Sequence, residues 1–139
     1  MFAGFDHVDT RVSSIALVEP FYDCLMPKIG LPRKRLAYVD ERGDWHDAKS
    51  GSYNAVEYYE DVAPPALPQF IGFIEDGRPP SATRIAFALP AAMNFDDALA
   101  LLEASGAKNV ELSAEMGIYP AVFFEDPGGT RLELCRRVR

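Results

Sequence analysis

The stretch FFEDPGGTRLEL (residues 123–134) joins an apolar run to a turn and then to a second run in which one carboxylate stands between two leucines. The Asp-Pro pair favours a turn, and the two glycines that follow can adopt positive φ angles. Successive side chains of a strand point to opposite faces, so Leu132 and Leu134 share one face and Glu133 lies on the other. The leucines are expected in the core, which leaves Glu133 facing either solvent or a polar cavity.

The rest of the sequence predicts two similar series of elements, identified by their apolar periodicity. The first series is a strand, a helix and three strands, at residues 5–12, 13–31, 36–40, 54–60 and 69–75. The second series has the same order, at residues 83–89, 95–107, 109–113, 120–125 and 130–136. His7 and Arg84 lie 77 positions apart, and the helix-ending Gly30 and Gly106 lie 76 apart. This agreement indicates an internal duplication.

The sequence makes more detailed predictions for the first helix and for the segment at residues 41–52. The helix has a buried stripe predicted at every fourth position, at Leu17, Phe21, Leu25 and Ile29, and Pro20 is expected to bend or restart it. The loop at 41–52 is predicted from its Gly, Asp and Ser content. His46 within it is interpreted as a turn side chain rather than a catalytic group.

Composition limits the classes of protein that fit. The chain has 139 residues, 48% of them hydrophobic, which suits one globular domain. Its net charge of −7 argues against nucleic acid as a partner. No apolar run reaches the length of about 18 residues that crosses a membrane. Cys24 and Cys135 have neither metal-site spacing nor the number that a disulfide framework needs. We therefore expect a cytoplasmic protein with neither nucleic acid nor membrane as a partner.

Two strand–helix–three-strand series that end in EDPGGTRLEL resemble the vicinal oxygen chelate superfamily, which includes glyoxalase I, bleomycin resistance proteins and extradiol dioxygenases. The end of the chain is similar to that family's F-x-x-DP-x-G-x-x-x-E-L signature, and FDHV (5–8) and RIAF (84–87) support the resemblance. The resemblance implies an α+β fold in which two βαβββ modules, 5–75 and 83–136, form one glyoxalase-like domain over residues 1–139. Their curved mixed sheets would surround a cup for a small organic ligand, and a homodimer is expected. The cup can form within one chain or across two.

The resemblance also assigns site residues. The family's metal ligands come from the first and last strands of each module, which places the first ligand on His7 and the last on Glu133. The third position falls on Arg84, whose guanidinium stays protonated and has no lone pair for a metal. The fourth lies around residues 70–72, which contain no obvious ligand. The nearby alternatives are Gln69 and, with a different strand alignment, Glu57.

Arg84 therefore leads to a hypothesis about the site. It shares a strand face with Ala86 and Ala88, which leave room for a ligand. The resemblance implies that His7, Arg84 and Glu133 project into one cavity as the candidate catalytic residues, with His7 and Glu133 as metal ligands if a metal is bound. We hypothesise that Arg84 supplies the positive charge of the missing metal and forms an ion pair with Glu133.

Three functions remain open at this stage. The first is a glyoxalase-type lyase, isomerase or dioxygenase that uses a metal held by His7 and Glu133. The second is a binding or resistance protein that holds a compound without chemistry. The third is metal-free catalysis, with Arg84 stabilising an oxyanion and Glu133 or His7 acting as the base. The cofactor is unknown, because Arg84 stands where a divalent metal would need a ligand, and the fold by itself does not choose among the three.

Overall fold

The computed structural model describes residues 1–48 and 51–137 of the chain. Within these residues, nine strands form two sheets and two helices are present. The first half contains β1 (His7–Arg11), α1 (Ile15–Lys28), β2 (Arg33–Val39), β3 (Trp45–Asp47), β4 (Ala55–Tyr59) and β5 (Phe70–Ile74). The second half contains β6 (Arg84–Ala88), α2 (Phe95–Ser105), β7 (Lys108–Leu112), β8 (Ala121–Glu125) and β9 (Arg131–Cys135).

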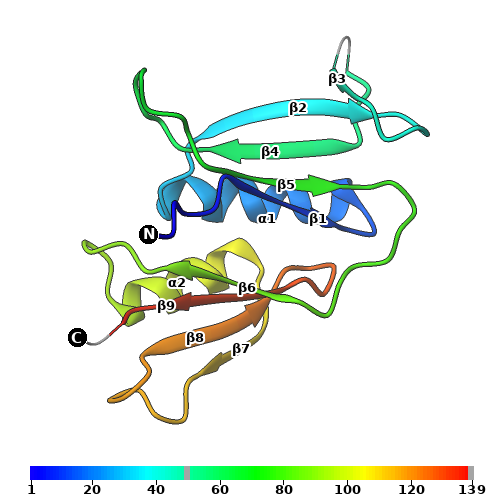
Figure 1. The fold of residues 1–139 in the computed structure, drawn as a ribbon. Coiled ribbons are helices and arrows are strands. Elements are labelled where there is room, and N and C mark those ends of the chain that lie inside the picture. Colours follow the sequence, from blue (N-terminus) through cyan, green and yellow to red (C-terminus); the bar gives the residue numbers. More distant parts are fainter. Residues whose placement is uncertain (49–50, 138–139) are drawn as a thin grey trace.

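Both sheets are mixed, as predicted. The first has the strand order β1-β5-β4-β2-β3 and the second β6-β9-β8-β7 (Figure 1). In each sheet the first strand of the half runs parallel to the last one, β1 beside β5 and β6 beside β9, and the other pairs are antiparallel. The predicted α+β fold of two curved sheets is confirmed, and the two halves repeat one topology apart from the short β3.

The helix α1 begins where the sequence predicts but buries a different stripe. The Ser14 hydroxyl accepts a hydrogen bond from the backbone N–H of Leu17, which caps the first turn. The helix continues through Pro20 as one segment, so the expected restart does not occur. Leu17 is 51% exposed. A spacing of four residues drifts around a helix of 3.6 residues per turn, and the stripe actually buried consists of Ile15, Val18, Phe21, Tyr22, Leu25 and Met26.

The helix α2 has a defined end on each side. Asn94 and Asp97 form a capping box, in which each side chain accepts a hydrogen bond from the other residue's backbone N–H. Gly106 follows the last turn with φ +84°, a left-handed conformation that glycine adopts without steric cost. The predicted helix-ending glycine is therefore confirmed here.

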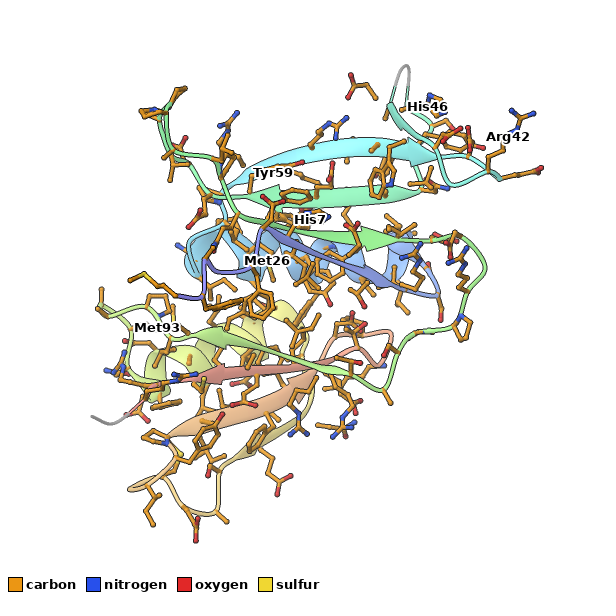
Figure 2. The ribbon with its side chains drawn as sticks, viewed as in Figure 1. His7, Met26, Arg42, His46, Tyr59 and Met93 are labelled. Atoms are coloured by element: carbon orange, nitrogen blue, oxygen red, sulfur yellow. The ribbon has the colours of Figure 1, made fainter. Side chains whose placement is uncertain are left out.

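Both sheets bury one face against the two helices in a single core. The first sheet contributes Val56, Tyr58, Ile71 and Phe73, and the second contributes Val122, Phe124, Leu132 and Leu134. The helices contact each other, and the ring of Phe21 in α1 lies 6.3 Å from that of Phe124 in the second sheet. Met26 of α1 lies between the two sheets in Figure 2. The helices thus form a layer between the sheets.

The other face of each sheet points away from this helix layer. We call them the first outer face, which carries His7, Asp9, Arg35, Glu57, Tyr59 and Phe70, and the second outer face, which carries Arg84, Ala86, Ala88, Phe123, Arg131, Glu133 and Cys135. No helix among the described residues covers either outer face, because α1 and α2 occupy the opposite ones.

A buried hydrogen bond joins α1 to the turn before β9. The Tyr22 hydroxyl donates to Oδ2 of Asp126 at 2.6 Å. Asp126 is fully buried, and its Oδ1 accepts from the backbone N–H groups of Gly128 and Thr130. The Asp-Pro-Gly-Gly turn at residues 126–129 is therefore tied to a helix more than one hundred residues earlier.

The predicted loop at 41–52 and the segment at 61–68, which lies between two predicted strands, have different outcomes. The one at 41–52 contains β3, which pairs with β2, so the prediction of a continuous loop was wrong there, and residues 49–50 lie outside the described part. The loop at 61–68 contains neither helix nor strand. As to membranes, no helix in residues 1–48 or 51–137 has the length and apolar character needed to span one.

Candidate functional site

Glu133 is a buried carboxylate on an otherwise open face. It lies in the middle of β9, on the second outer face, and is only 5% exposed. The Tyr119 hydroxyl donates a hydrogen bond to its Oε1 at 2.5 Å. This bond, together with partial burial, raises the pKa of Tyr119 to about 12. The pKa of the neighbouring Cys135 thiol is also raised, chiefly by burial. Glu133 thus faces a polar enclosure built by Tyr119.

Arg84 lies beside this enclosure without an ion-pair partner among the described residues. Its guanidinium carbon is 4.5 Å from the centre of the Phe123 ring, a cation–π contact. The expected ion pair with Glu133 is not formed. The register explains the difference: Arg84 stands opposite Arg131 and Glu133 opposite Ala86, so the two side chains are offset along the sheet.

His7 lies on the first outer face, in the edge strand β1. Its Nδ1 is 2.7 Å from Asp6 Oδ2 and its Nε2 is 3.6 Å from Asp9 Oδ2. The hydrogen bond to Asp6 and the charges of the nearby carboxylates raise the pKa of His7 and outweigh the opposing effect of burial. Its ring stacks on Phe70 with centres 4.5 Å apart.

The structure does not bring the three predicted residues together in one chain. His7 belongs to the first outer face, whereas Arg84 and Glu133 belong to the second, and the helix layer lies between the two sheets. A cup that contains all three would therefore need both outer faces to meet, which the alternation of side chains could not reveal.

The residues present do not fit the divalent metal that the fold family implies. Among residues 1–48 and 51–137, no group of three or more His, Cys, Asp or Glu side chains is arranged to hold a metal ion. Arg84 occupies one of the four ligand positions and cannot donate a lone pair. Residues 70–72 occupy another and include only Phe, Ile and Gly. Gln69 and Glu57 do not supply the missing ligands: the side-chain amide of Gln69 donates to the Phe5 carbonyl, and Glu57 is held by Arg35.

The first outer face contains a second polar cluster that the sequence reasoning largely missed. Glu57 is 3% exposed; Arg35 Nη1 donates to its Oε1 at 2.8 Å and the Tyr59 hydroxyl to its Oε2 at 3.1 Å. Asp9 leans over Gly72, where an added Cβ would lie 2.5 Å from its Oδ1. Burial raises the pKa of Asp9, against the opposing charge of its cationic neighbours. The sequence did contain a signal for this cluster, because Glu57 is a carboxylate in the middle of the otherwise apolar and aromatic predicted strand NAVEYYE (54–60).

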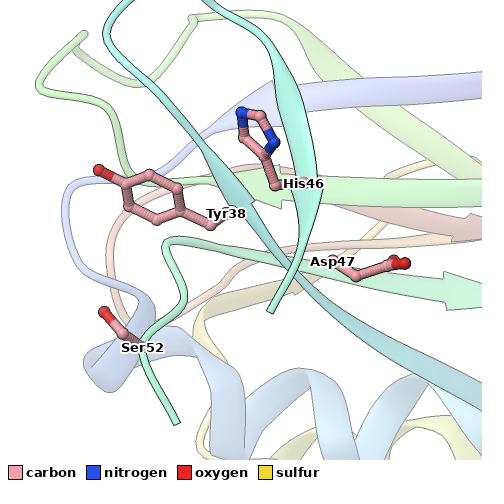
Figure 3. Close-up of a pocket in the computed structure, with 4 residues that line it drawn as sticks. All are labelled: Tyr38, His46, Asp47 and Ser52. Carbon is pink, nitrogen blue, oxygen red and sulfur yellow. The ribbon is translucent and has the colours of Figure 1, made fainter. Parts of the chain in front are cut away.

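His46 belongs to a different region, at the far end of the first sheet. A cavity of about 520 Å³ is lined there by Tyr38, His46, Asp47 and Ser52 (Figure 3). His46 is in β3 rather than a turn, and its Nε2 is 2.8 Å from Asp40 Oδ2. This contact, with backbone hydrogen bonds, lowers the pKa of Asp40. His46 is thus paired with the nearby Asp40. It stands apart from the predicted site residues His7, Arg84 and Glu133.

A larger cavity lies on the second outer face next to the Glu133 enclosure. It has a volume of about 570 Å³ and is lined by Ala86, Ala88, Tyr119, Cys135 and Arg137, among others. The volume suits a small organic ligand. The small side chains of β6 leave this space open, as the sequence predicted for its alanine face.

Comparisons with known proteins identify the fold. A glyoxalase/bleomycin resistance protein from Albidiferax ferrireducens T118 superposes with a TM-score of 0.59 at 17% identity, over 96% of this chain and 98% of that one. The fosfomycin resistance protein FosX from Listeria monocytogenes, complexed with Mn(II) and sulfate ion, gives 0.57 at 17% identity, over 99% and 95%. This is the fold of the vicinal oxygen chelate superfamily. A glyoxalase/bleomycin resistance/dioxygenase domain from Frankia sp. EAN1pec also matches, with 0.59 at 12% identity over 99% and 100%. No protein-family model and no curated protein matches the sequence.

Proposed function

We propose that residues 1–139 form one glyoxalase-like domain that binds a small organic anion on the second outer face, without a divalent metal. The observation that carries this proposal is the guanidinium of Arg84, which is held over Phe123 and has no carboxylate partner among the described residues. A guanidinium binds carboxylate or phosphonate oxygens through two parallel hydrogen bonds. It supplies here the positive charge that a metal supplies in relatives such as the Mn(II)-bound FosX.

The surroundings of Arg84 agree with an anionic ligand. The cavity of about 570 Å³ beside Glu133 is lined by Arg136 and Arg137 as well as by Tyr119. Arg136 is occupied by the backbone carbonyls of Pro90 and Met93. Arg137 remains to bind an anion in this cavity; Arg84 does not line the cavity but stands two positions before Ala86 on the same strand face, so it can reach only a ligand that extends along β6. The hydroxyl of Tyr119 lies on the buried Glu133 carboxylate.

The domain is expected to work as a homodimer. Each chain leaves two sheet faces without a helix over them among the described residues: the first outer face carries Asp9 and the Arg35–Glu57 pair, and the second carries Arg84, Arg131 and Glu133. In a two-fold pair, the first outer face of one copy covers the second outer face of the other. Two cups result, and each unites His7 of one chain with Arg84 and Glu133 of its partner.

A catalytic role as a lyase or isomerase is a second candidate, favoured by the hydrogen bond between Tyr119 and Glu133. A carboxylate that accepts a short hydrogen bond from a phenol can exchange a proton with a bound ligand. In that case Glu133 is the base, and Arg84 stabilises the negative charge that develops on the ligand.

The test is calorimetric titration with fosfomycin, a phosphonate, and benzoate, a carboxylate. Arg84→Gln is expected to weaken binding by about tenfold or more, because a hydrogen bond to a charged group is lost. Arg78→Gln, which removes an exposed arginine that contacts Asp76 elsewhere, is the control. Equal affinity in the two variants would refute the role of Arg84, and stoichiometric metal by elemental analysis would refute the metal-free site. Light scattering that gives the mass of one chain would refute the dimer.

A further inference from the structure

Three side chains on the first outer face form a row of stacked rings. Tyr59 of β4, Phe70 of β5 and His7 of β1 stand opposite one another in register. The ring centres of Tyr59 and Phe70 are 4.3 Å apart with an interplanar angle of 19°, and those of Phe70 and His7 are 4.5 Å apart at 4°. Figure 2 shows Tyr59 and His7 close together, and Phe70 of the intervening strand β5 stacks on both. The row crosses the sheet with the spacing of its strands.

The row ends at the free edge of the sheet. Because β1 is the edge strand, Phe70 covers one face of the His7 ring and the other face is directed off the edge. The side chain of His7 is accordingly 42% exposed. A cavity of about 410 Å³ lies at this edge, lined by His7 and Phe70 on one side and by Ala86 and Ala88 of β6 on the other. Its volume is within the range of small-molecule sites.

We propose that this cavity binds a planar aromatic ring without negative charge, which stacks on the open face of His7 as the fourth ring of the row. A planar ring follows from the near-parallel orientation of the three rings already present, which a puckered ring cannot continue. The absence of negative charge follows from the carboxylates of Asp6 and Glu60, which also line the cavity. The small side chains of Ala86 and Ala88 leave room for the ring.

This site takes a different ligand from the anion site proposed above, although Ala86 and Ala88 line both cavities and His7 also belongs to the cup proposed for the dimer. It lies at the junction of the two halves of one chain and needs neither the guanidinium of Arg84 nor the carboxylate of Glu133. The two sites differ in ligand charge, so each can be tested without the other.

The experiment is an NMR titration of the full chain with phenol and with cyclohexanol, which match in size and hydroxyl group but differ in planarity. The chain has two histidines, so the imidazole protons of His7 and His46 can each be followed. His46 is in β3 at the opposite edge of the sheet and serves as the internal control. Phenol is expected to move the His7 signals upfield through its ring current, to leave His46 unchanged, and to bind about fivefold more tightly than cyclohexanol, the equivalent of one aromatic pair at about 1 kcal/mol.

Two variants make the test specific. Phe70→Leu removes the middle ring and is expected to abolish the preference for phenol over cyclohexanol. Ala88→Leu fills the cavity from the β6 side and is expected to weaken phenol binding by about tenfold while His7 stays stacked on Phe70. If Phe70→Leu does not fold, Ala88→Leu alone decides the matter.

Equal affinities for phenol and cyclohexanol, equal shifts of the two histidines, or full phenol binding by folded Ala88→Leu would each overturn the proposal. Arg84→Gln separates it from the proposed function. That variant is expected to lose anion affinity and to keep phenol affinity, so failure of one proposal does not imply failure of the other.

Discussion

The hydroxyl of Tyr22 is expected to contribute more to stability than that of any surface tyrosine, because it is the donor to a carboxylate that water does not reach. Tyr22→Phe keeps the ring, which is 1% exposed and stacks on Phe73 with centres 3.7 Å apart. What is lost is the 2.6 Å hydrogen bond to Oδ2 of Asp126, a residue with no exposed surface. A buried charged acceptor then lacks one donor.

The loss is expected to be about 2 kcal/mol in the free energy of unfolding, the usual size for a hydrogen bond to a charged group. With an unfolding entropy of about 2.1 cal/mol/K per residue, this lowers the Tm of a chain of this length by about 7 °C. Urea unfolding followed by circular dichroism measures the first quantity, and a thermal scan measures the second.

Tyr58→Phe is the matched control. Tyr58 is 2% exposed, and its hydroxyl donates to Asp23 at 2.9 Å, but the Asp23 side chain is 45% exposed and can bind water instead. This variant is expected to lose less than about 1 kcal/mol. Equal losses in the two variants, or no loss in Tyr22→Phe, would refute the argument that the Asp126 bond is strong because it is buried.

Three further predictions concern pH, a close approach and a helix cap. Burial and the Asp126 carboxylate raise the pKa of Tyr22 well above 10.0, so the stability contributed by the protonated Tyr22 hydroxyl is complete below about pH 10 and is lost at higher pH. Above pH 10 the free energy of unfolding, measured with urea, should fall less steeply with pH in Tyr22→Phe than in the parent chain, by up to about 1.4 kcal/mol per pH unit, and parallel curves would contradict this. Gly72→Ala should cost about 0.5–1.5 kcal/mol in urea unfolding because its Cβ would lie 2.5 Å from Asp9 Oδ1 and the Asp9 side chain would have to rotate away from it, whereas Gly117→Ala, with no atom within 4 Å, should be neutral. Asn94→Ala should cost about 1 kcal/mol through the lost capping box, and an unchanged urea midpoint would show that this cap is dispensable.

Most elements of the fold were predictable because their signals are local. Alternation along RIAFA and RLELC, and a capping residue with a helix-ending glycine around α2, each involve a few neighbouring residues. The exceptions are also local in origin. The strand β3 spans three residues in a segment rich in Gly and Asp, too few for a period to appear. Leu17 is exposed because a four-residue spacing is only an approximation to the helical repeat.

The candidate site was predictable only in part. Alternation correctly placed Glu133 and Arg84 on the face away from the core leucines, but it could not show that Tyr119 would donate to Glu133 or that Arg84 would lie on Phe123. Those contacts depend on strand register, which pairs residues from different parts of the chain. Arg35, which lies outside its predicted strand, was missed as the partner of Glu57 for the same reason.

The sequence by itself determined which side chains share a face, where the helices start and end, and which residue types are available for chemistry, because backbone geometry imposes these patterns on any short segment. Only the tertiary structure decided which faces meet. The contacts of α1 with the second half of the chain, Phe21 with Phe124 of β8 and Tyr22 with Asp126 of the turn before β9, place the helices between the sheets and turn both polar faces outward. These contacts join residues about one hundred positions apart. Which of these contacts form depends on how well the helix and sheet surfaces pack together in the core, and no pattern within a short segment determines that.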